Sequence, residues 1–307
     1  MKDKYIQFFN MSHMKANLLM LIATLIWGTA FVSQVTGMGT IGPFTFSFAR
    51  FFLASLTVLP LALIYEKDNF AKFLDNKNYI YLSLLAGLAL FGGMGLQQYA
   101  LLKSQIANTA FLSTLYVPFV SLISRFIFKS FIHWVIWIAV LLCLYGSYLL
   151  SSNQAIDIQR SDSLLFIAAF CFAIHIIIID IFIKKFYSPF AFGFIQYVVV
   201  FTFSLILAFS LETPKFSNIQ IEWFEIVYTG VFSAGIGYTL QIIAQSKASP
   251  APAAIILSME SVFGTLAAWI LLNQVLDLNK ILGCLAIFVG VIIVQFLQIN
   301  HNKERYE

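Results

Sequence analysis

Four ionisable residues interrupt long apolar runs of this 307-residue sequence, and they are the first candidates for chemistry. Glu260 lies in SMESVFG, His175 and Asp180 lie in IHIIIID, and Arg50 lies in SFARFFL. A charged group among apolar residues loses its hydration, so it needs an opposite charge, a proton, a hydrogen-bond partner or a bound solute. These residues therefore predict a polar site inside an apolar environment.

The residue types differ in what they can bind. Glu260 could bind a substrate or a proton, or it could hold helices together as a paired or protonated group. His175 could transfer protons near neutral pH or donate one hydrogen bond between helices. Arg50 could bind a carboxylate bidentately, pair with Glu260 or extend toward the outer surface. Asp180 precedes Lys184 by one helical turn, which predicts an interfacial ion pair. Asp180 also lies about 140° around a helix from His175, so these two should not share a face.

The composition requires that lipid surrounds most of the chain. Hydrophobic residues make up 60% of it and charged residues 10%, whereas soluble domains are about 45–50% apolar and about 25% charged. Ten apolar runs are each long enough to cross about 30 Å of hydrocarbon as an α-helix. The predicted fold class is an all-α integral membrane protein with ten transmembrane helices, at residues 16–35, 44–65, 79–102, 106–128, 133–151, 163–183, 190–210, 224–246, 250–272 and 280–298.

The basic residues predict the orientation of these spans. Ten spans place both termini on one side, and a cytoplasmic placement agrees with the positive-inside rule. The cytoplasmic set is Lys2, Lys4, Lys15, Lys67, Lys72, Lys77, Arg125, Lys129, Lys184, Lys185, Lys247, Lys303 and Arg305, against Lys103, Arg160, Lys215 and Lys280 outside. We expect a multi-pass protein of the cell inner (plasma) membrane with cytoplasmic termini. No basic patch interleaved with exposed aromatic residues indicates nucleic-acid binding.

The chain contains one polar motif twice. GMGLQQYALLK begins at Gly93 and GYTLQIIAQSK begins at Gly237, 144 positions later. Further matches at offsets of 144 to 146 join Pro43 to Pro189, Phe44 to Phe190, Phe48 to Phe194, Glu66 to Glu212 and Gly146 to Gly290. These matches predict an internal duplication.

The proposed repeats are residues 16–151 and 162–298, with five spans each. Because five is odd, the second repeat enters the membrane from the opposite side, so the repeats are inverted. Inverted repeats are typical of alternating-access transporters that bind substrate near the membrane midplane.

Three segments also resemble a known family: WGTAF from Trp27, IGPFTF leading to Arg50, and residues 238–260 followed by Gly283 and Gly290. Over about residues 16–297 the chain is similar to EamA-type members of the drug/metabolite transporter superfamily, which have two five-helix repeats. The resemblance implies a transporter, and related transporters carry amino acids, nucleobases, vitamins, sugar conjugates or drugs, by export or import. One departure is that many members end helices four and nine with a Leu-Gly-Glu-like turn, where this chain has FKS and LNQ.

The repeat relates the candidate site residues to one another. Tyr116 is the counterpart of Glu260, and Gln196 is the counterpart of Arg50. The amides and phenol of the duplicated motif could form an uncharged polar site or join helices by hydrogen bonds, and Trp27 could stack on a ring-bearing substrate. The predicted substrate site consists of Glu260, Tyr116, Arg50, His175, Gln97, Gln98, Gln241, Tyr238, Gln196 and Trp27.

Glycine and proline predict where the helices depart from regularity. A glycine cluster in span three (Gly92, Gly93, Gly95) and another in span eight (Gly235, Gly237) predict close helix approach. Pro118, Pro250 and Pro252 predict interruptions in the helices that carry Tyr116 and Glu260, with backbone groups freed toward a cavity.

These observations favour a secondary transporter, by export or exchange, of a small organic metabolite such as an amino acid. Vitamin, nucleobase or other metabolite import on the same fold is the alternative. The sequence contains no Walker motif, no HExxH and no GxSxG, so an ATP-driven pump or an intramembrane enzyme is disfavoured. A channel would require a continuous polar stripe. We expect no cofactor, no metal and no nucleic-acid partner, membrane lipid as the surroundings, and a monomer or homodimer.

Overall fold

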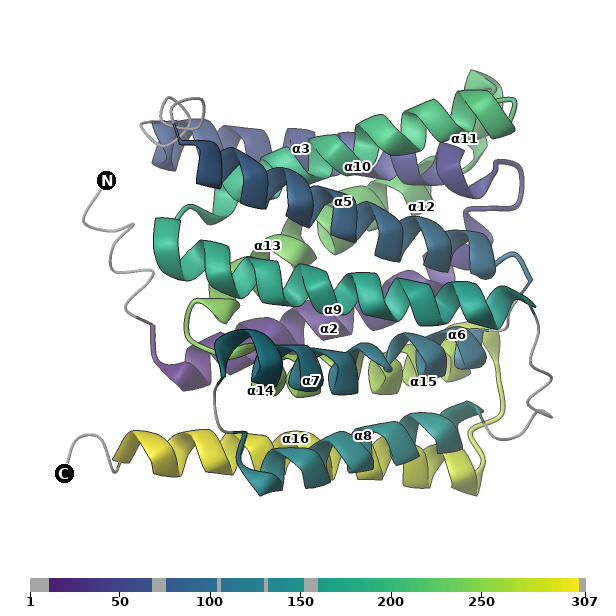
Figure 1. Cartoon of the computed structure of the whole chain (residues 1–307). Coiled ribbons are helices and arrows are strands. Elements are labelled where there is room, and N and C mark those ends of the chain that lie inside the picture. Colours follow the sequence, from purple (N-terminus) through teal and green to yellow (C-terminus); the bar gives the residue numbers. More distant parts are fainter. Residues whose placement is uncertain (1–10, 68–75, 104–105, 130–131, 152–159, 304–307) are drawn as a thin grey trace.

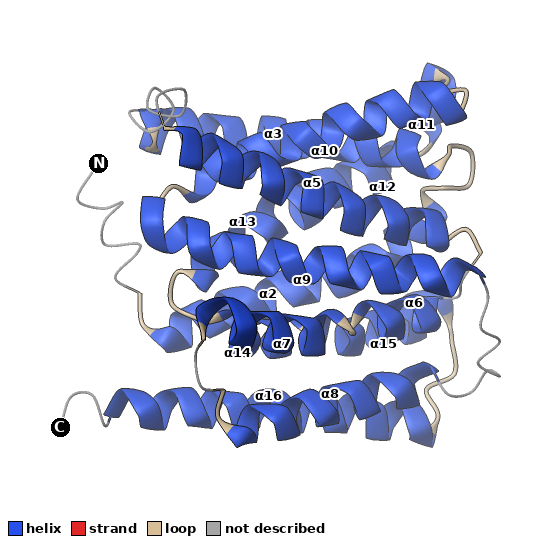
Figure 2. Cartoon of the chain, in the orientation of Figure 1, coloured by secondary structure: helices blue, strands red, loops and turns tan. Residues whose placement is uncertain are grey.

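The structure is a computed structural model that describes residues 11–67, 76–103, 106–129, 132–151 and 160–303. Within these ranges the chain forms helices and no strand (Figure 2). Ten helical segments are long and apolar enough to cross a membrane. The predicted class, an all-α integral membrane protein with ten spans, is confirmed.

Five spans come from each half of the chain. The first five are α2 (His13–Thr36), α3 (Pro43–Tyr65), α5 (Lys77–Ala100), α6 with α7 (Ile106–Ser113 and Tyr116–Phe128) and α8 (Trp134–Ser151). The second half begins with α9 (Arg160–Phe186) and α10 (Pro189–Leu211), followed by the short α11 (Phe216–Ile221). Its last three spans are α12, η1 and α13 (Trp223–Val227, Tyr228–Gly237 and Tyr238–Gln245), α14 with α15 (Pro250–Leu257 and Met259–Leu272) and α16 (Leu278–Lys303).

Equivalent residues begin and end equivalent helices. Pro43 and Pro189 are the first residues of α3 and α10, a position where the missing N–H of proline leaves no bond unmade. Lys129 and Asn273 follow α7 and α15 in the left-handed conformation, with φ of 49° and 52°, which is the usual way to end a helix abruptly. The duplication seen in the sequence therefore extends to helix boundaries.

The two halves cross the bundle in opposite senses. The start of α2 and the end of α16 lie on the same side, at the left of Figure 1. From there α2 runs to the right, whereas α9, the first span of the second half, runs from right to left. The two five-helix repeats are therefore inverted, as predicted.

Helices of the two halves pack against each other throughout the bundle. α3 packs on α10 and α8 packs on α16, and each pair joins equivalent spans of the two repeats. These pairs lie at the upper and lower edges of Figure 1, with α2 and α9 between them. The central helices α2 and α9 make equivalent contacts, α2 with α15 and α13 and α9 with α7 and α5. The interface between the repeats therefore runs from edge to edge of the bundle, and α2 and α9 carry it through the middle.

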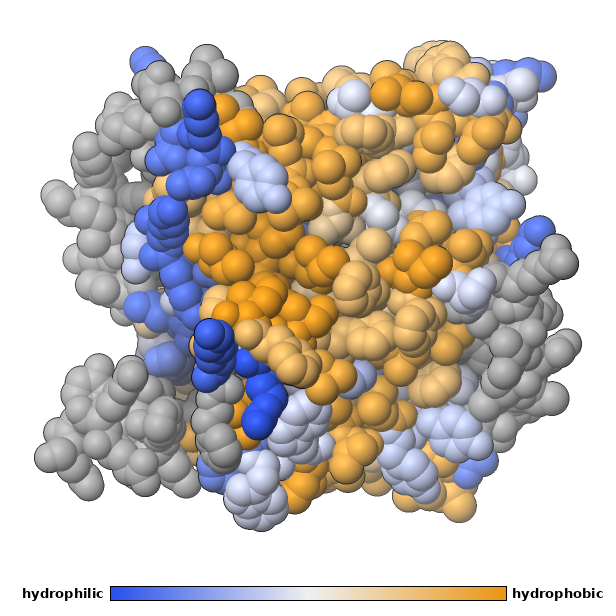
Figure 3. All heavy atoms as spheres, viewed as in Figure 1, coloured by the Kyte–Doolittle hydropathy of each residue, from blue (hydrophilic) through white to orange (hydrophobic). Residues whose placement is uncertain are grey.

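The surface has the pattern expected of a membrane protein. A broad hydrophobic band crosses the face seen in Figure 3, and hydrophilic residues gather at its left and right margins. Of the basic residues that predict the orientation, Lys2, Lys4, Lys72 and Arg305 lie outside the described residues. The assignment of the left margin to the cytoplasm stays a prediction.

Spans four and nine are broken at equivalent positions. The first break lies at Thr114 and Leu115, and the second at Ser258, 144 positions after Thr114. The two broken segments meet, because Thr114 Oγ1 and Ser261 Oγ are 3.1 Å apart in a buried hydrogen bond. Two discontinuous helices therefore face each other near the centre of the bundle.

Interruptions were predicted in these helices from their prolines, which account for the break in span four but not for the one in span nine. Pro118 lies four residues after Thr114, so it cannot donate to the Thr114 carbonyl and its ring crowds that carbonyl, at the position of the first break. Pro250 and Pro252 are the first and third residues of α14, before the break at Ser258. A first helical turn has no partner for its N–H groups, so proline there starts a helix without breaking one. At Ser258 the hydroxyl donates to the Ile255 carbonyl at 2.6 Å, which occupies a backbone acceptor at the break.

Span eight contains a ten-residue π-helix, η1, that was not predicted. Trp27 Nε1 donates to the Ser233 carbonyl within it at 3.0 Å. A Cβ atom at Gly237 would come within 2.6 Å of Trp27 Nε1, and one at Gly93 within 2.6 Å of Phe172 Cε1. The predicted close helix approach at both glycine clusters is therefore confirmed.

Candidate functional site

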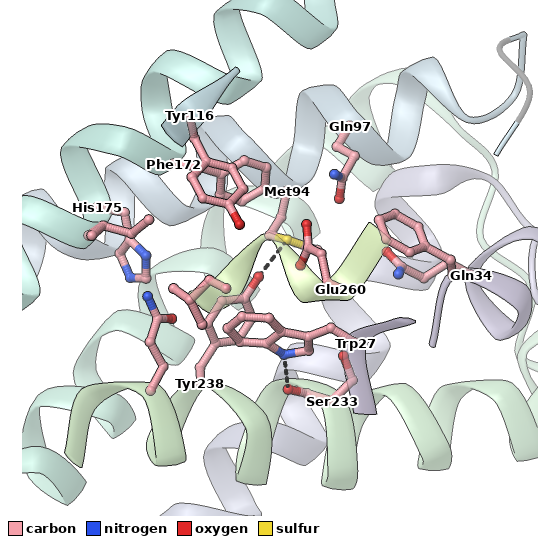
Figure 4. Close-up of a pocket in the computed structure, with 14 residues that line it drawn as sticks. Trp27, Gln34, Met94, Gln97, Tyr116, Phe172, His175, Ser233, Tyr238 and Glu260 are labelled. Atoms are coloured by element: carbon pink, nitrogen blue, oxygen red, sulfur yellow. Dashed lines mark hydrogen bonds between the residues drawn. The ribbon is translucent and has the colours of Figure 1, made fainter. Parts of the chain in front are cut away.

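A cavity lies between the two repeats, next to the breaks in spans four and nine (Figure 4). Its volume is about 540 Å³ with the open side included, and residues of both repeats line it. Helices α2, α5 and α7 contribute from the first repeat, and α9, η1, α13, α14 and α15 from the second.

Glu260 presents its carboxyl group to this cavity. It is the second residue of α15, directly after the break at Ser258. Figure 4 shows its oxygens among Met94, Gln97 and Gln34. Among the described residues, none forms a hydrogen bond or an ion pair with this carboxyl group. An acidic group without a protein partner at this depth requires a proton, water or a cationic solute.

Tyr116, the counterpart of Glu260, lines the same cavity from α7. Its hydroxyl is buried, has no hydrogen-bond partner in the described part of the chain, and points toward Glu260 in Figure 4. The two repeats therefore contribute equivalent polar positions to one cavity.

Trp27 and Tyr238 form an aromatic wall, with ring centroids 4.8 Å apart. The Tyr238 hydroxyl donates to Met94 Sδ at 2.8 Å, and Met94 is the residue 144 positions earlier in the first repeat. Phe31 and Phe172 add two more rings. Such a wall suits a flat or apolar solute and also favours a cation over its ring faces.

His175 lines the cavity from α9, and its Nε2 is 2.7 Å from Gln196 Oε1. Gln196 lies behind His175 and does not line the cavity. In the tautomer that protonates Nε2, the ring donates to the amide oxygen, which fixes the orientation of the imidazole.

Arg50 lies behind the cavity wall, 1% exposed. Its Nη1 donates to Gln34 Oε1 at 3.0 Å, and its Cζ lies 5.4 Å and 5.2 Å from the ring centroids of Phe46 and Phe51. Two of the roles expected for Arg50 are wrong. It neither extends to the surface nor pairs with Glu260, because Gln34 and the two rings hold it inside.

The duplicated glutamines Gln97 and Gln241 both line the cavity. Gln97 donates to Ser113 Oγ at 2.7 Å, and Gln241 donates to Gln245 Oε1 at 3.0 Å. Gln98 does not line the cavity, and its amide donates to the backbone carbonyl of Gln34 at 3.2 Å.

Seven of the ten predicted site residues thus share one cavity: Glu260, Tyr116, His175, Gln97, Gln241, Tyr238 and Trp27. Arg50, Gln98 and Gln196 lie behind it, each hydrogen-bonded to a residue that lines it. Gln34, Met94 and Ser233 line the cavity and were missed. Gln34 could have been found, because it lies seven residues after Trp27, on the same helix face.

The predicted ion pair between Asp180 and Lys184 is confirmed, with Nζ and Oδ1 2.5 Å apart. Lys184 is 46% exposed on its side chain, and neither residue lines the cavity. Asp180 therefore belongs to the end of α9 and is separate from the site.

These features define a polytopic membrane protein with a central cavity between inverted repeats. The sequence model of the EamA-like transporter family matches the chain twice, at residues 14–152 and 159–296. The chain therefore belongs to the EamA-like transporter family.

Several known proteins are similar along nearly the whole chain. An uncharacterized transporter of Archaeoglobus fulgidus is 28% identical over 91% of this chain and 85% of its own length. The uncharacterized transporter YoaV of Bacillus subtilis is 23% identical over 92% of this chain and 97% of its own. A solved crystal structure at 17% identity superposes with a TM-score of 0.77, covering 94% of this chain and 99% of that one. At this identity the structural likeness shows the fold alone.

Proposed function

We propose that this protein is a secondary transporter of a small organic metabolite, such as an amino acid or a related compound, by export or exchange. Transport proceeds by alternating access, with the solute bound in the central cavity. The membrane is the inner (plasma) membrane of a bacterial cell, and both termini are cytoplasmic.

One observation carries the proposal. The cavity lies between two inverted repeats and is bounded by two discontinuous helices, and the carboxyl group of Glu260 enters it without a partner among the described residues. Discontinuous helices at a repeat interface form the solute and ion sites of several transporter folds. Because an unpaired carboxyl group is costly in a membrane, its placement in a cavity supports a role in binding.

The proposal is tested by comparing metabolites inside and outside cells that express the wild type, Glu260→Gln or an empty vector. Glu225→Gln is the matched control, because Glu225 lies outside the cavity and receives one long hydrogen bond, 3.4 Å from Thr36 Oγ1. We expect one solute to move between the compartments with the wild type and Glu225→Gln. Glu260→Gln should not move it.

Other outcomes change the assignment. A solute that accumulates inside the cells would indicate import, for example of a vitamin or nucleobase. If no solute is moved by wild-type protein that is shown to be in the membrane, the proposed transport is contradicted.

A further inference from the structure

Two opposite charges lie at membrane depth without pairing to each other. Glu260 faces the cavity, and Arg50 is buried one layer behind it. Neither forms an ion pair with any described residue, and Arg50 Nε and Nη2 have no hydrogen-bond partner there. A buried guanidinium and a carboxyl group that are both left unpaired are costly. A solute that offsets both charges, directly at Glu260 and indirectly at Arg50, would therefore gain binding free energy from each.

Gln34 connects Arg50 to the cavity. Its Oε1 accepts from Arg50 Nη1 at 3.0 Å, while its Nε2 makes a long bond of 3.3 Å to the Ala30 carbonyl. Since the oxygen is held by a cation, the amide group is fixed, and one of its two N–H groups remains available to an acceptor. Gln34 is itself a cavity residue. The positive charge of Arg50 therefore reaches the cavity as a polarised N–H donor.

The cavity has two polar positions of opposite sign, the Glu260 carboxyl group and the Gln34 amide that Arg50 holds. Glu260 and Gln34, whose amide oxygen Arg50 holds, line the same cavity. No Lys or Arg is among the residues that line the cavity, and His175 is engaged with Gln196. Glu260 is thus the negative pole, and Gln34 in front of Arg50 is the positive one.

We propose that the cavity binds a zwitterionic solute, with its ammonium group at Glu260 and its carboxylate at the Gln34 amide. Arg50 is a positioning residue that orients and polarises this amide. The apolar part of the solute lies against Trp27, Phe31 and Phe172. The inference rests on the proposed transport function and specifies the chemistry of its substrate.

The test uses matched sets of probes that differ only in charge. One set is phenylalanine, its amide, which keeps the ammonium group, and 3-phenylpropanoate, which keeps the carboxylate; the second set is the equivalent series from leucine. Binding to the purified protein is measured as competition with the transported solute and as stabilisation against heating. In at least one set the zwitterion should bind about tenfold more tightly than either singly charged probe of that set, because Glu260 and the Gln34 amide each contribute a charge-assisted hydrogen bond.

Variants at Gln34 and Arg50 should lose one preference among the probes, and a variant at Glu260 should lose the other. Gln34→Met and Arg50→Met should remove the advantage of the amino acid over its amide, and Arg50→Lys should restore part of it. Glu260→Gln should instead remove the tighter binding of the amino acid relative to the acid that lacks the ammonium group. A merely structural role of Arg50 would weaken all probes equally, and each variant is first compared with the wild type in melting temperature without ligand.

Other results separate this inference from the proposed function. If a solute is transported in a Glu260-dependent way but the amide binds as well as the amino acid, transport stands and the zwitterion site is overturned. The same holds if the transported solute carries no carboxylate. If no solute is transported and no probe binds, both proposals are overturned.

Discussion

Glu66 and Glu212 connect α3 and α10 reciprocally, because each directly follows one of these helices and accepts hydrogen bonds from the first turn of the other. Glu66 follows α3 and accepts hydrogen bonds at the start of α10 from the backbone N–H groups of Phe190 and Ala191, at 3.1 Å and 2.8 Å. Ser188 Oγ, just before α10, also donates to it at 2.6 Å.

Glu212 makes the equivalent contacts at the other end. It follows α10 and accepts from the N–H groups of Phe44 and Thr45 at the start of α3, at 2.9 Å and 2.8 Å, and from Thr45 Oγ1 at 2.6 Å. A carboxylate at a helix N-terminus satisfies free N–H groups and complements the helix dipole. The antiparallel pair α3 and α10 is therefore tied together at both ends by the same device.

Replacing either glutamate by glutamine should lower the stability of the protein. Glu66→Gln and Glu212→Gln each exchange a charged acceptor for a neutral one, and we expect a loss of about 1–2 kcal/mol. The measurement is the melting temperature of the purified protein in detergent. Glu225→Gln, which changes the same chemistry at a weakly bonded site, should melt close to the wild type. Equal melting temperatures for all three variants would contradict a capping role.

The sequence predicted the elements of the fold because membrane helices are set by long apolar runs and repeats by matching positions. The same matches predicted that Glu260 and Tyr116 are equivalent, and both line the cavity. Their common position in the cavity could be inferred because inverted repeats place equivalent residues symmetrically about a shared axis. The break at Ser258 could not be assigned in this way, since a serine hydroxyl disturbs a helix through local hydrogen bonds that many serines do not make.

The parts that were missed depend on contacts between distant segments. The π-helix η1 is accompanied by a hydrogen bond between Trp27 and Ser233, which are 206 positions apart. Arg50 was expected to extend to the surface or to bind a charged partner directly. Its burial depends on Gln34, Phe46 and Phe51 surrounding it, and no local pattern in the sequence shows that combination.

Two glycines of α5 should respond differently to alanine. At Gly93 a Cβ atom would lie 2.6 Å from Phe172 Cε1, whereas at Gly95 the nearest atoms are at 3.7 Å. We expect Gly93→Ala to destabilise the protein by about 1–3 kcal/mol through overpacking, and Gly95→Ala to be tolerated. Because Phe172 lines the cavity, Gly93→Ala should also weaken solute binding. Thermal unfolding of the two variants tests the packing, and equal effects would contradict it.

Trp27→Phe should lower stability and disturb the cavity while keeping an aromatic ring. It removes the donor to the Ser233 carbonyl, which contributes about 0.5–1.5 kcal/mol. Trp269→Phe is the control, because Trp269 is 47% exposed and lies outside the cavity. The melting temperatures of both variants are compared with that of the wild type. If Trp269→Phe has the larger effect, the hydrogen bond to η1 is not important for stability.

The orientation predicted from the basic residues can be tested by labelling single cysteines. In a protein whose Cys143, Cys171 and Cys284 are replaced by alanine, Lys15→Cys and Lys215→Cys place exposed thiols at opposite ends of the bundle. A membrane-impermeant maleimide should label Lys215→Cys in intact cells and Lys15→Cys only after lysis. The reverse pattern would place both termini outside.

Substitutions of Glu260 should separate charge from shape in the transport step. Glu260→Gln keeps the size of the side chain but removes its charge, so transport in proteoliposomes should fall by about tenfold or more, as expected for the loss of a charge-assisted hydrogen bond. Glu260→Asp keeps the charge on a shorter side chain and should retain intermediate transport. Tyr116→Phe removes a neutral hydroxyl that has no partner among the described residues, so its loss should be smaller. If Glu260→Gln transports at the wild-type rate with the wild-type melting temperature, the carboxyl group is not a ligand, and the solute binds through the aromatic and amide groups of the cavity.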